Sequence, residues 1–281
     1  MLRNTFCHVP GIGGKTERGL WTRGIHSWED VLTMPPEMLA QKNHYFLRNR
    51  LMESMERIEE GDSGYFAGTL PSSQHWRMFP EFRSEVAYLD IETTGMAGPD
   101  NHLTTVALYN GRDVSYYVKD QNLHRFRDDI AAYKLVVTYN GKCFDVPMIE
   151  RYLGIRMPRA HIDLRFVLGS LGFKGGLKGC EKQLGLDRGE LDGVDGFFAV
   201  VLWHDYQTSG NIHALETLLA YNILDAVNLE SLMVQAYNLK LKDTPFEDYL
   251  RLPEPRAVEN PFTAHMPTVN RLMSLWGYHK D

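Results

Sequence analysis

Cysteine is scarce in this chain, and its three cysteines, Cys7, Cys143 and Cys180, lie far apart without a C-x-x-C pair. This spacing favours neither a disulfide framework nor a cysteine zinc site. No apolar run approaches the roughly 20 residues that a membrane span requires. The first residues also lack the long apolar core of a signal peptide. We therefore expect a cytoplasmic protein in a reducing compartment, with no membrane partner.

An excess of basic residues is also missing, because the formal net charge is -6. A protein that binds nucleic acid mainly through its phosphates is expected to be basic, so a tight non-specific binder is disfavoured. The charge argues less against a nuclease, because a metal site needs several acids and the bound cations reverse the local field. The 281 residues suffice for one large core with an appendage, or for two modest domains.

Residues 1–60 have a helical pattern with a glycine turn at Pro10–Thr16. The turn nearly matches a P-loop, but Val9 stands where the first glycine belongs and no strand precedes it, so nucleotide binding is excluded there. We expect a tight turn between two short helices, followed by a helix capped by Ser27. The pattern resembles a helix-hairpin-helix element, in which backbone N–H groups and Lys15 meet a phosphate. A turn that packs on the main domain without a ligand is the alternative.

Beyond these residues the pattern predicts an α/β fold. A helix over 36–58 leads to a glycine- and proline-rich linker or wrap at 61–82, whose aromatic residues indicate that it lies on another part of the protein. The pattern then predicts five strands, at Val86–Ile91, Leu103–Tyr109, Val114–Val118, Leu135–Tyr139 and His161–Leu164. It predicts helices at Leu123–Tyr133, Val146–Leu153, Leu177–Leu184 and Asn211–Leu239, and a loop at Gly169–Gly176. The expected division is a helical segment (1–60), the linker (61–82), an α/β domain (83–240) and a C-terminal extension that wraps the domain (241–281).

The stretch Tyr88–Gly95 carries the first candidate site. Asp90 and Glu92 follow an apolar run on a strand, so both side chains point to the same face. Two neighbouring carboxylates repel each other unless a cation shares them. Hard oxygen ligands of this kind suit Mg²⁺ or Mn²⁺. The alternative is a solvated edge strand that carries D-x-E by chance.

Two further acids stand at positions where a site can form. Asp145 follows the fourth strand at the start of a helix, where an N-cap is the alternative role. Tyr221 and Asp225 lie four residues apart on one face of an apolar helix. An aspartate in such surroundings needs a partner, whereas a tyrosine there more often packs in the core.

The motifs occur in the order D-x-E, N-x3-F-D and Y-x3-D, at Asp90, Asn140 and Tyr221. Together they resemble the DEDD (DnaQ-like) superfamily of 3′–5′ exonucleases, which has a ribonuclease-H-like fold. The Y-x3-D spacing is similar to that of its tyrosine subgroup. The helix-hairpin-helix pattern together with L-D-I-E-T-T-G resembles the YprB-type branch of predicted exonucleases. The resemblance implies a ribonuclease-H-like mixed sheet flanked by helices and preceded by a small helical segment.

The resemblance also implies a two-metal mechanism in which Tyr221 orients the attacking water. The implied ligands of the two ions, Mg²⁺ or Mn²⁺, are Asp90, Glu92, Asp145 and Asp225. The implied substrate contacts are Thr93, Thr94, Gly95, Asn140 and Phe144, with Lys15 of the helical segment. The partner is a nucleic acid with a 3′ end, DNA or RNA, expected to be single-stranded.

Two other functions remain open at this point. A ribonuclease-H-like endonuclease would cut internally, and a non-catalytic nucleic-acid-binding module would keep the fold without the reaction. Lys174, Lys178 and Lys182 are spaced by four and are either a strip that follows a phosphate backbone or a solvated helix face. Asp163 is expected at a solvated strand end, and the alternative is a supporting role behind the metal ligands.

Overall fold

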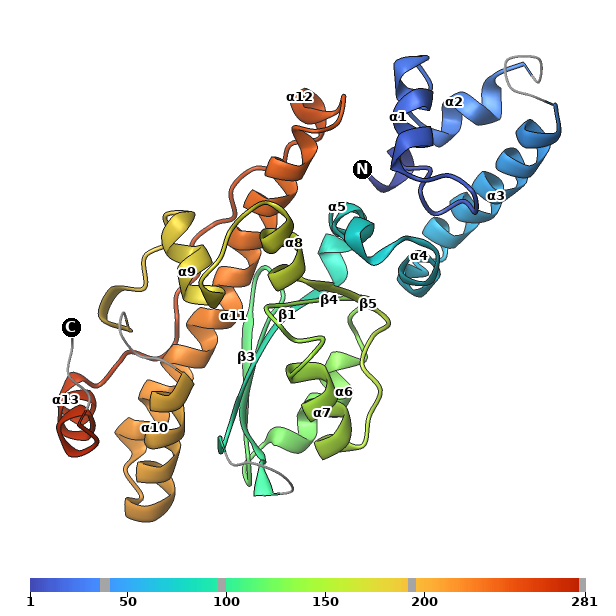
Figure 1. The fold of residues 1–281 in the computed structure, drawn as a ribbon. Helices are drawn as coiled ribbons and strands as arrows, with labels where there is room; N and C mark the ends of the chain where they lie inside the picture. The colour runs from blue at the N-terminus through green and yellow to red at the C-terminus, as the bar shows by residue number, and fades with distance from the viewer. Residues whose placement is uncertain (36–40, 96–99, 192–195, 278–281) are drawn as a thin grey trace.

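One five-stranded sheet forms the centre of the molecule, with the strand order β3-β2-β1-β4-β5 (Figure 1). The computed structural model describes residues 1–35, 41–95, 100–191 and 196–277. The sheet is mixed, because β1 pairs antiparallel with β2 and parallel with β4. The strands are β1 (Val86–Thr93), β2 (Leu103–Tyr109), β3 (Val114–Val118), β4 (Leu135–Thr138) and β5 (Ala160–Asp163). All five predicted strands are confirmed.

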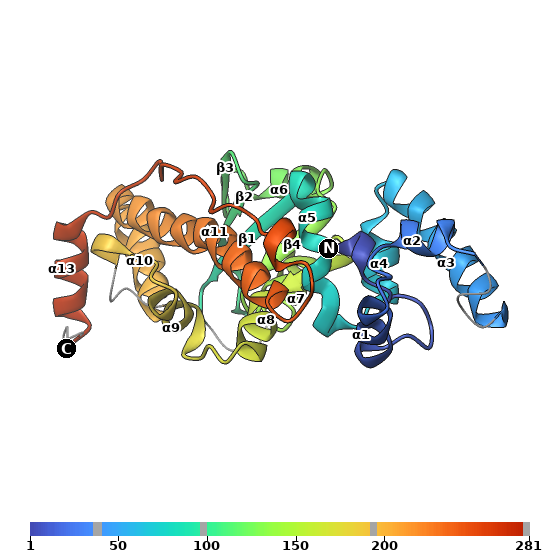
Figure 2. The ribbon, with the colours of Figure 1, turned by 90° about the horizontal axis from the view of Figure 1, so that it is seen from above.

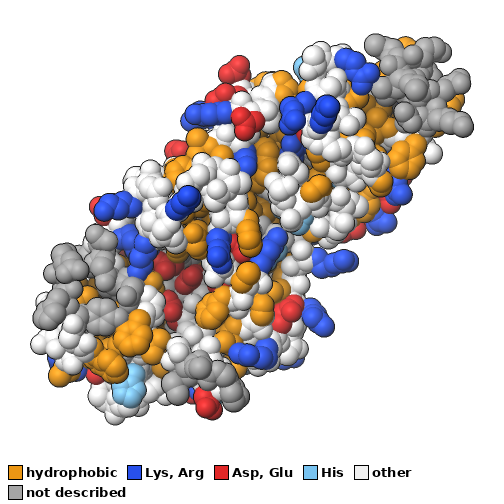
Figure 3. Space-filling view, viewed as in Figure 1, with side chains coloured by type: hydrophobic (Ala, Val, Ile, Leu, Met, Phe, Trp, Pro, Cys, Tyr) orange, Lys and Arg blue, Asp and Glu red, His pale blue; other side chains and the backbone are white. Residues whose placement is uncertain are grey.

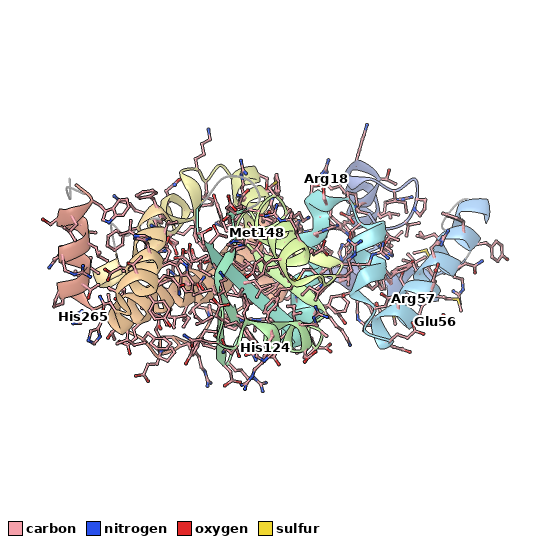
Figure 4. The ribbon with its side chains drawn as sticks, turned by 90° about the horizontal axis from the view of Figure 1, so that it is seen from below. Arg18, Glu56, Arg57, His124, Met148 and His265 are labelled. Carbon is pink, nitrogen blue, oxygen red and sulfur yellow. The ribbon has the colours of Figure 1, made fainter. Side chains whose placement is uncertain are left out.

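Helices cover both faces of this sheet. The 3₁₀ turn η6 (Leu123–Arg125), α6 (Phe126–Ile130) and α7 (Asp145–Leu153) lie on one side, which Figure 4 shows from below with Met148 of α7 labelled. The long helix α11 (Ile212–Leu241) crosses β1 and β2 on the other side (Figure 1). The predicted mixed sheet between helices is confirmed.

The side chains of β1 alternate between these two layers. Leu89 and Ile91 belong to the core beneath α7, and Tyr88 belongs to the core beneath α11. Because strand side chains alternate, Asp90 and Glu92 share the α11 face with Tyr88. The central strand therefore places two acids under the longest helix.

The sequence pattern does not predict three further helices, α8, α10 and α13. α8 (Leu164–Ser170) ends inside Gly169–Gly176, where the pattern predicts a loop. α10 (Gly196–Ser209) is so apolar that no helical period stands out. α13 (Met266–Leu275) begins with Pro267 in its first turn, where proline is tolerated, so a proline here starts a helix in the predicted wrap.

The remaining helices on the α11 side complete the core domain. α9 (Gly176–Gln183) confirms the helix predicted at Leu177–Leu184, and the short η7 (Gly189–Leu191) follows it. α12 (Glu247–Leu250) lies after α11. None of the helices among the described residues combines the length and apolar character that a membrane crossing needs.

The N-terminal helices lie at one end of an elongated molecule, opposite α13 (Figure 2). They are η1 (Leu2–Asn4), α1 (Gly14–Thr22), α2 (Trp28–Thr33) and α3 (Gln41–Glu59). Only the three-residue 3₁₀ turn η1 precedes the glycine turn, so the expected helix on that side is absent from the described residues. Ser27 caps α2 as predicted, because its Oγ accepts from the Asp30 backbone N–H. Residues 36–40, where the predicted helix would begin, lie outside the described residues.

Residues 61–85 form short helices in place of the predicted irregular wrap. Pro71 precedes the first turn of η3, and Pro80 stands in the first turn of α5, so both prolines begin helices. The elements are α4 (Ser63–Thr69), η3 (Ser72–Met78), α5 (Phe79–Phe82) and η4 (Arg83–Glu85). The buried Arg77 of η3 pairs with the buried Glu17 of α1 over 2.7 Å, which ties the N-terminal helices to this segment.

Candidate metal centre and active-site cleft

Three carboxylates from two elements meet over the central strand of the sheet. Asp90 and Glu92 lie on β1, and Asp225 lies on α11, which crosses that strand. One oxygen of each carboxylate lies within 4.8 Å of one oxygen of each of the other two. The predicted Y-x3-D helix therefore brings its acid to the predicted D-x-E pair.

Burial and mutual repulsion make these acids hard to ionise together. Burial, followed by the carboxylates of Asp225 and Glu92, raises the pKa of Asp90 well above its usual range. Burial and Asp225 likewise raise the pKa of Glu92. A divalent cation would relieve this repulsion, and carboxylate oxygens are the ligands that Mg²⁺ and Mn²⁺ prefer. The donor set therefore fits a divalent ion.

Asp145 faces the same cleft but lies outside the three-carboxylate group. It is the first residue of α7 and is buried. Burial raises the pKa of its carboxyl group to about 7. It lines the cleft together with Asp90, Glu92 and Asp225, and its charge contributes to the raised pKa of Glu92. The structure thus brings all four predicted acids to one region, with three in a tight group and one beside them.

Asn222, which the sequence motifs do not single out, holds Asp90 in place. Its Nδ2 donates to Asp90 Oδ2 over 2.6 Å, and its Oδ1 accepts from Thr105 Oγ1 over 2.9 Å. Both Asn222 and Thr105 are fully buried. The signal was available in the sequence, because an asparagine in the middle of an apolar helix needs a hydrogen-bonding partner.

Arg188 is a second residue that the motifs miss. It lies between α9 and η7, and its Nη2 donates to Asp225 Oδ1 over 2.5 Å. Its Nη1 donates to Glu181 Oε2 of α9 over 2.7 Å. Glu181 also accepts from Asn228 Nδ2 over 2.7 Å, so a buried network anchors the arginine to α11. One positive charge therefore stands next to the acid cluster.

Tyr221 is packed between two cations and the acids. The Lys178 ammonium lies 4.9 Å from its ring centroid, and the Arg188 guanidinium carbon lies 5.4 Å from it. Burial, and then the charges of Asp225 and Glu92, raise the pKa of its hydroxyl far above the ordinary range. The hydroxyl is consequently neutral at any working pH and can donate a hydrogen bond.

Asp90, Glu92, Tyr221 and Asp225 form one side of a cleft with a volume of about 670 Å³. In the space-filling view, acidic side chains lie inside a central hollow, and Lys and Arg side chains stand around it (Figure 3). The opposite wall is formed by the loop after β4, by α8 and by the glycine-rich start of α9. The cleft is therefore acidic at its floor and basic at its rim.

The comparison with protein families bears on what such a cleft can do. The family model described as RNase H superfamily matches residues 87–237, which is more than half of the chain. The chain belongs to the RNase H superfamily. Neither the curated proteins nor the solved structures gave a significant match. The match extends from β1 through most of α11, so it contains every residue of the acid cluster.

Only some of the predicted substrate contacts lie at the cleft. Asn140 and Phe144 line the cleft, and Asn140 adopts a left-handed conformation with φ 66°. Thr93 ends β1, and Thr94 and Gly95 follow it, but none of the three is among the described residues that line the cleft. Lys15 lies at the exposed start of α1, among the N-terminal helices and away from the cleft (Figure 1).

The three lysines of the strip lie in different surroundings, and Asp163 differs from expectation. Lys174 lines the cleft and Lys178 packs on Tyr221, whereas Lys182 is exposed on the last turn of α9. Asp163 is not at a solvated strand end. It is 2% exposed and accepts the backbone N–H groups of Asn140, Lys142 and Arg165. Its carboxylate shapes the loop that carries Asn140 and Phe144.

Proposed function

We propose that this RNase H superfamily chain is a metal-dependent 3′–5′ exonuclease. Its substrate is a single-stranded nucleic acid, DNA or RNA, from whose 3′ end nucleotides are removed. The observation that carries the proposal is the meeting of Asp90, Glu92 and Asp225 in a cleft that also holds Tyr221. The motif order and the Y-x3-D spacing support the tyrosine subgroup of the DEDD superfamily, and the leading helices support its YprB-type branch.

The acid cluster is the proposed site of two ions, Mg²⁺ or Mn²⁺. Asp90, Glu92 and Asp225 would hold one ion, and Asp90 together with Asp145 would serve the other, Asp145 directly or through water. Bound ions supply an activated water and neutralise the charge that develops on the leaving 3′ oxygen. The grouping of three carboxylates, with Asp145 beside them in the same cleft, supports this role. A module that only binds nucleic acid gains nothing from carboxylates that repel phosphate.

The protein side chains have separate tasks in this proposal. Tyr221 keeps its proton and orients the attacking water by hydrogen bonding, because its raised pKa rules out the role of a base at neutral pH. Asn222 fixes the orientation of Asp90, and Arg188 fixes that of Asp225. These two residues act as positioning residues through the acids that they contact.

The substrate contacts follow from exposure and position. Phe144 is 42% exposed in the cleft, so its ring is available to stack on the last base. Asn140 stands beside it, and the backbone at Thr93, Thr94 and Gly95 follows Glu92 at the end of β1, where a terminal nucleotide can be met. Lys15 would contact a phosphate at the start of α1, on a part of the strand distant from the reaction.

The test is Mg²⁺- or Mn²⁺-dependent release of mononucleotides from 5′-labelled single-stranded DNA and RNA. We expect a ladder that shortens from the 3′ end for the wild-type protein and no product for Asp90→Ala or Asp225→Ala. Asp205→Asn is a matched control, because Asp205 is 8% exposed and pairs with Arg271 outside the cleft. Retained activity in a purified, folded Asp90→Ala or Asp225→Ala protein would refute the proposal.

A circular single strand separates the two rival functions from this one. An exonuclease leaves the circle intact, whereas an endonuclease of the same fold opens it. A protein that neither cleaves any substrate nor binds a divalent ion in calorimetry would be a binding module.

A further inference from the structure

A second cleft, with a volume of about 470 Å³, lies on the other side of α8 from the acid cluster. α8 forms a ridge between the two clefts. Arg165 and Gly169, four residues apart, line the acid cleft, whereas Phe166, Val167 and Ser170 line the second cleft. Figure 1 shows α8 between α9, which borders the acid cleft, and the helices that follow α4. The two clefts are therefore neighbours that share one helix as a wall.

The loop after β4 also contributes to both clefts. Asn140, Phe144 and Asp145 line the acid cleft, and Lys142 lines the second cleft. The backbone N–H groups of Asn140 and Lys142 are both held by the buried Asp163 carboxylate, at 2.7 and 3.0 Å. These hydrogen bonds hold the loop so that Asp145 faces the acid cleft and Lys142 faces the second cleft.

The second cleft contains two lysines without a salt bridge among the described residues. Lys142 and Lys240 are both half-buried, and burial lowers the pKa of each ammonium group. The acids that face them are Asp163, which is occupied by three backbone N–H groups, and Asp243 beyond the end of α11. Two partly desolvated cations that form no salt bridge with any residue the structure describes are arranged to receive anionic groups.

The rest of the cleft suits the other parts of a nucleotide. Phe166 is 56% exposed although it lines a cleft, and an exposed ring of this kind offers a stacking face for a base. Ser72 and Ser73 of η3 supply hydroxyl groups on the opposite wall. The combination of ammonium groups, an open aromatic ring and hydroxyl groups matches a phosphate, a base and a sugar.

We propose that the second cleft holds the single strand on the 5′ side of the scissile nucleotide, after the strand has crossed α8. The inference rests on the proposed exonuclease function and adds a binding site to it. A dinucleotide with its scissile bond at the acids leaves too little chain to cross a helix that is ~10 Å wide. Longer strands reach Lys142, Lys240 and Phe166, so affinity depends on substrate length.

The experiment compares Lys142→Gln/Lys240→Gln with wild type on a dinucleotide and on an octanucleotide. We expect the kcat/KM for the dinucleotide to stay unchanged and the KM for the octanucleotide to rise about tenfold, as the loss of two charge-assisted contacts predicts. The slope of log KM against log salt should flatten by about 1.4, because each single-strand phosphate contact contributes about 0.7. Lys119→Gln/Lys134→Gln removes the same charge outside both clefts and should leave the kinetic constants for both substrates unchanged.

Phe166→Ala provides an uncharged second variant. It should raise the KM for the octanucleotide about fivefold or more through lost stacking, while the salt slope keeps its wild-type value. Three results would each overturn the inference. The first is an equal fall in kcat/KM for the dinucleotide and the octanucleotide, and the second is an equal rise in KM for the Lys119→Gln/Lys134→Gln control. The third is an unchanged KM for the octanucleotide in Lys142→Gln/Lys240→Gln.

A binding measurement separates this inference from the proposed function. Fluorescence anisotropy of the labelled octanucleotide is measured in Mg²⁺ with Asp225→Asn, alone and combined with the lysine substitutions. Lysine-dependent binding without mononucleotide release by the wild-type protein would reject the exonuclease and retain the cleft as a strand-binding site. Binding that is indifferent to both lysines would reject the cleft even if the exonuclease is active.

Discussion

Arg188 Nη2 lies 2.5 Å from Asp225 Oδ1, and both side chains are buried beside the acid cluster. The Arg188 guanidinium supplies the cluster with a fixed positive charge before any metal binds. The same guanidinium binds Glu181 and lies against the Tyr221 ring, so it connects α9 to the centre of α11.

Replacing Arg188 tests how far the stability of the buried acids depends on its positive charge. We expect Arg188→Met to lower the free energy of unfolding of the metal-free protein by ~3–5 kcal/mol, because Asp225 and Glu181 are left buried without their partner. Mg²⁺ should raise the melting temperature more in Arg188→Met than in the wild-type protein, because the ion replaces the missing charge. Arg271→Met, which breaks the more exposed pair with Asp205, is the control and should show no added response to Mg²⁺. If Mg²⁺ raised the melting temperature of Arg188→Met and of the wild-type protein equally, Arg188 would not be the residue that offsets the charge of the acids.

The hydrogen bond from Asn222 to Asp90 makes a separate prediction. Asn222→Leu should lower metal-dependent activity by about 10- to 100-fold, the usual effect of removing a group that orients a metal ligand. It should also destabilise the protein, because the buried Thr105 hydroxyl loses its acceptor. In Asn222→Leu/Thr105→Val both partners are apolar, so stability should recover while activity stays low. Recovery of both quantities together would show that Asn222 matters only for folding.

The neutral hydroxyl of Tyr221 predicts a change in rate without a change in the shape of the pH profile. Tyr221→Phe should lower kcat by about 10- to 100-fold, which is below the range typical of a lost general base. The ring remains, so the contacts of Lys178 and Arg188 with it persist and the melting temperature should hold. Disappearance of an alkaline or acidic limb in the Tyr221→Phe profile would mean that the tyrosine exchanges a proton with the substrate.

The raised pKa values of the acids predict how stability varies with pH. The pKa of Asp145 is about 7 in the folded protein, against about 3.9 in an unfolded chain. Between these values only the folded state holds the proton, so the stability of the metal-free protein falls as pH rises, by up to ~1.4 kcal/mol per pH unit and proton. Asp90 and Glu92 act in the same direction, since burial and their neighbours raise the pKa of both.

Urea unfolding in EDTA between pH 5 and pH 8 measures this slope, and Asp145→Asn should flatten it. Mg²⁺ competes with protons for the carboxylates, so the stabilisation that it adds should grow as pH rises. A metal-free protein that becomes more stable from pH 5 to pH 7 would contradict the geometry of the cluster.

Much of the fold could be predicted from the sequence because the signals are local. The apolar runs around Asp90 and at Leu103–Tyr109 predict buried strands, and alternation along β1 predicts that Asp90 and Glu92 share a face. The apolar residues around Tyr221 and Asp225 likewise predict a helix. Prolines and glycines mislead at residues 61–85 and in α13, because the same residues that end one helix can begin the next.

Local patterns in the sequence predict the strands and the apolar helix that carry the acids, because strand alternation and helical period are properties of neighbouring residues. The mixed sheet is instead what the resemblance carried by the order of the motifs implies. The folded chain alone shows that Asn222 and Arg188 support those acids, since their partners Asp90 and Asp225 lie 132 and 37 residues away along the chain. It also shows that α8 separates two clefts, which no local pattern specifies. Contacts of that kind depend on how helices pack across a sheet, and packing is set by the summed burial of many side chains.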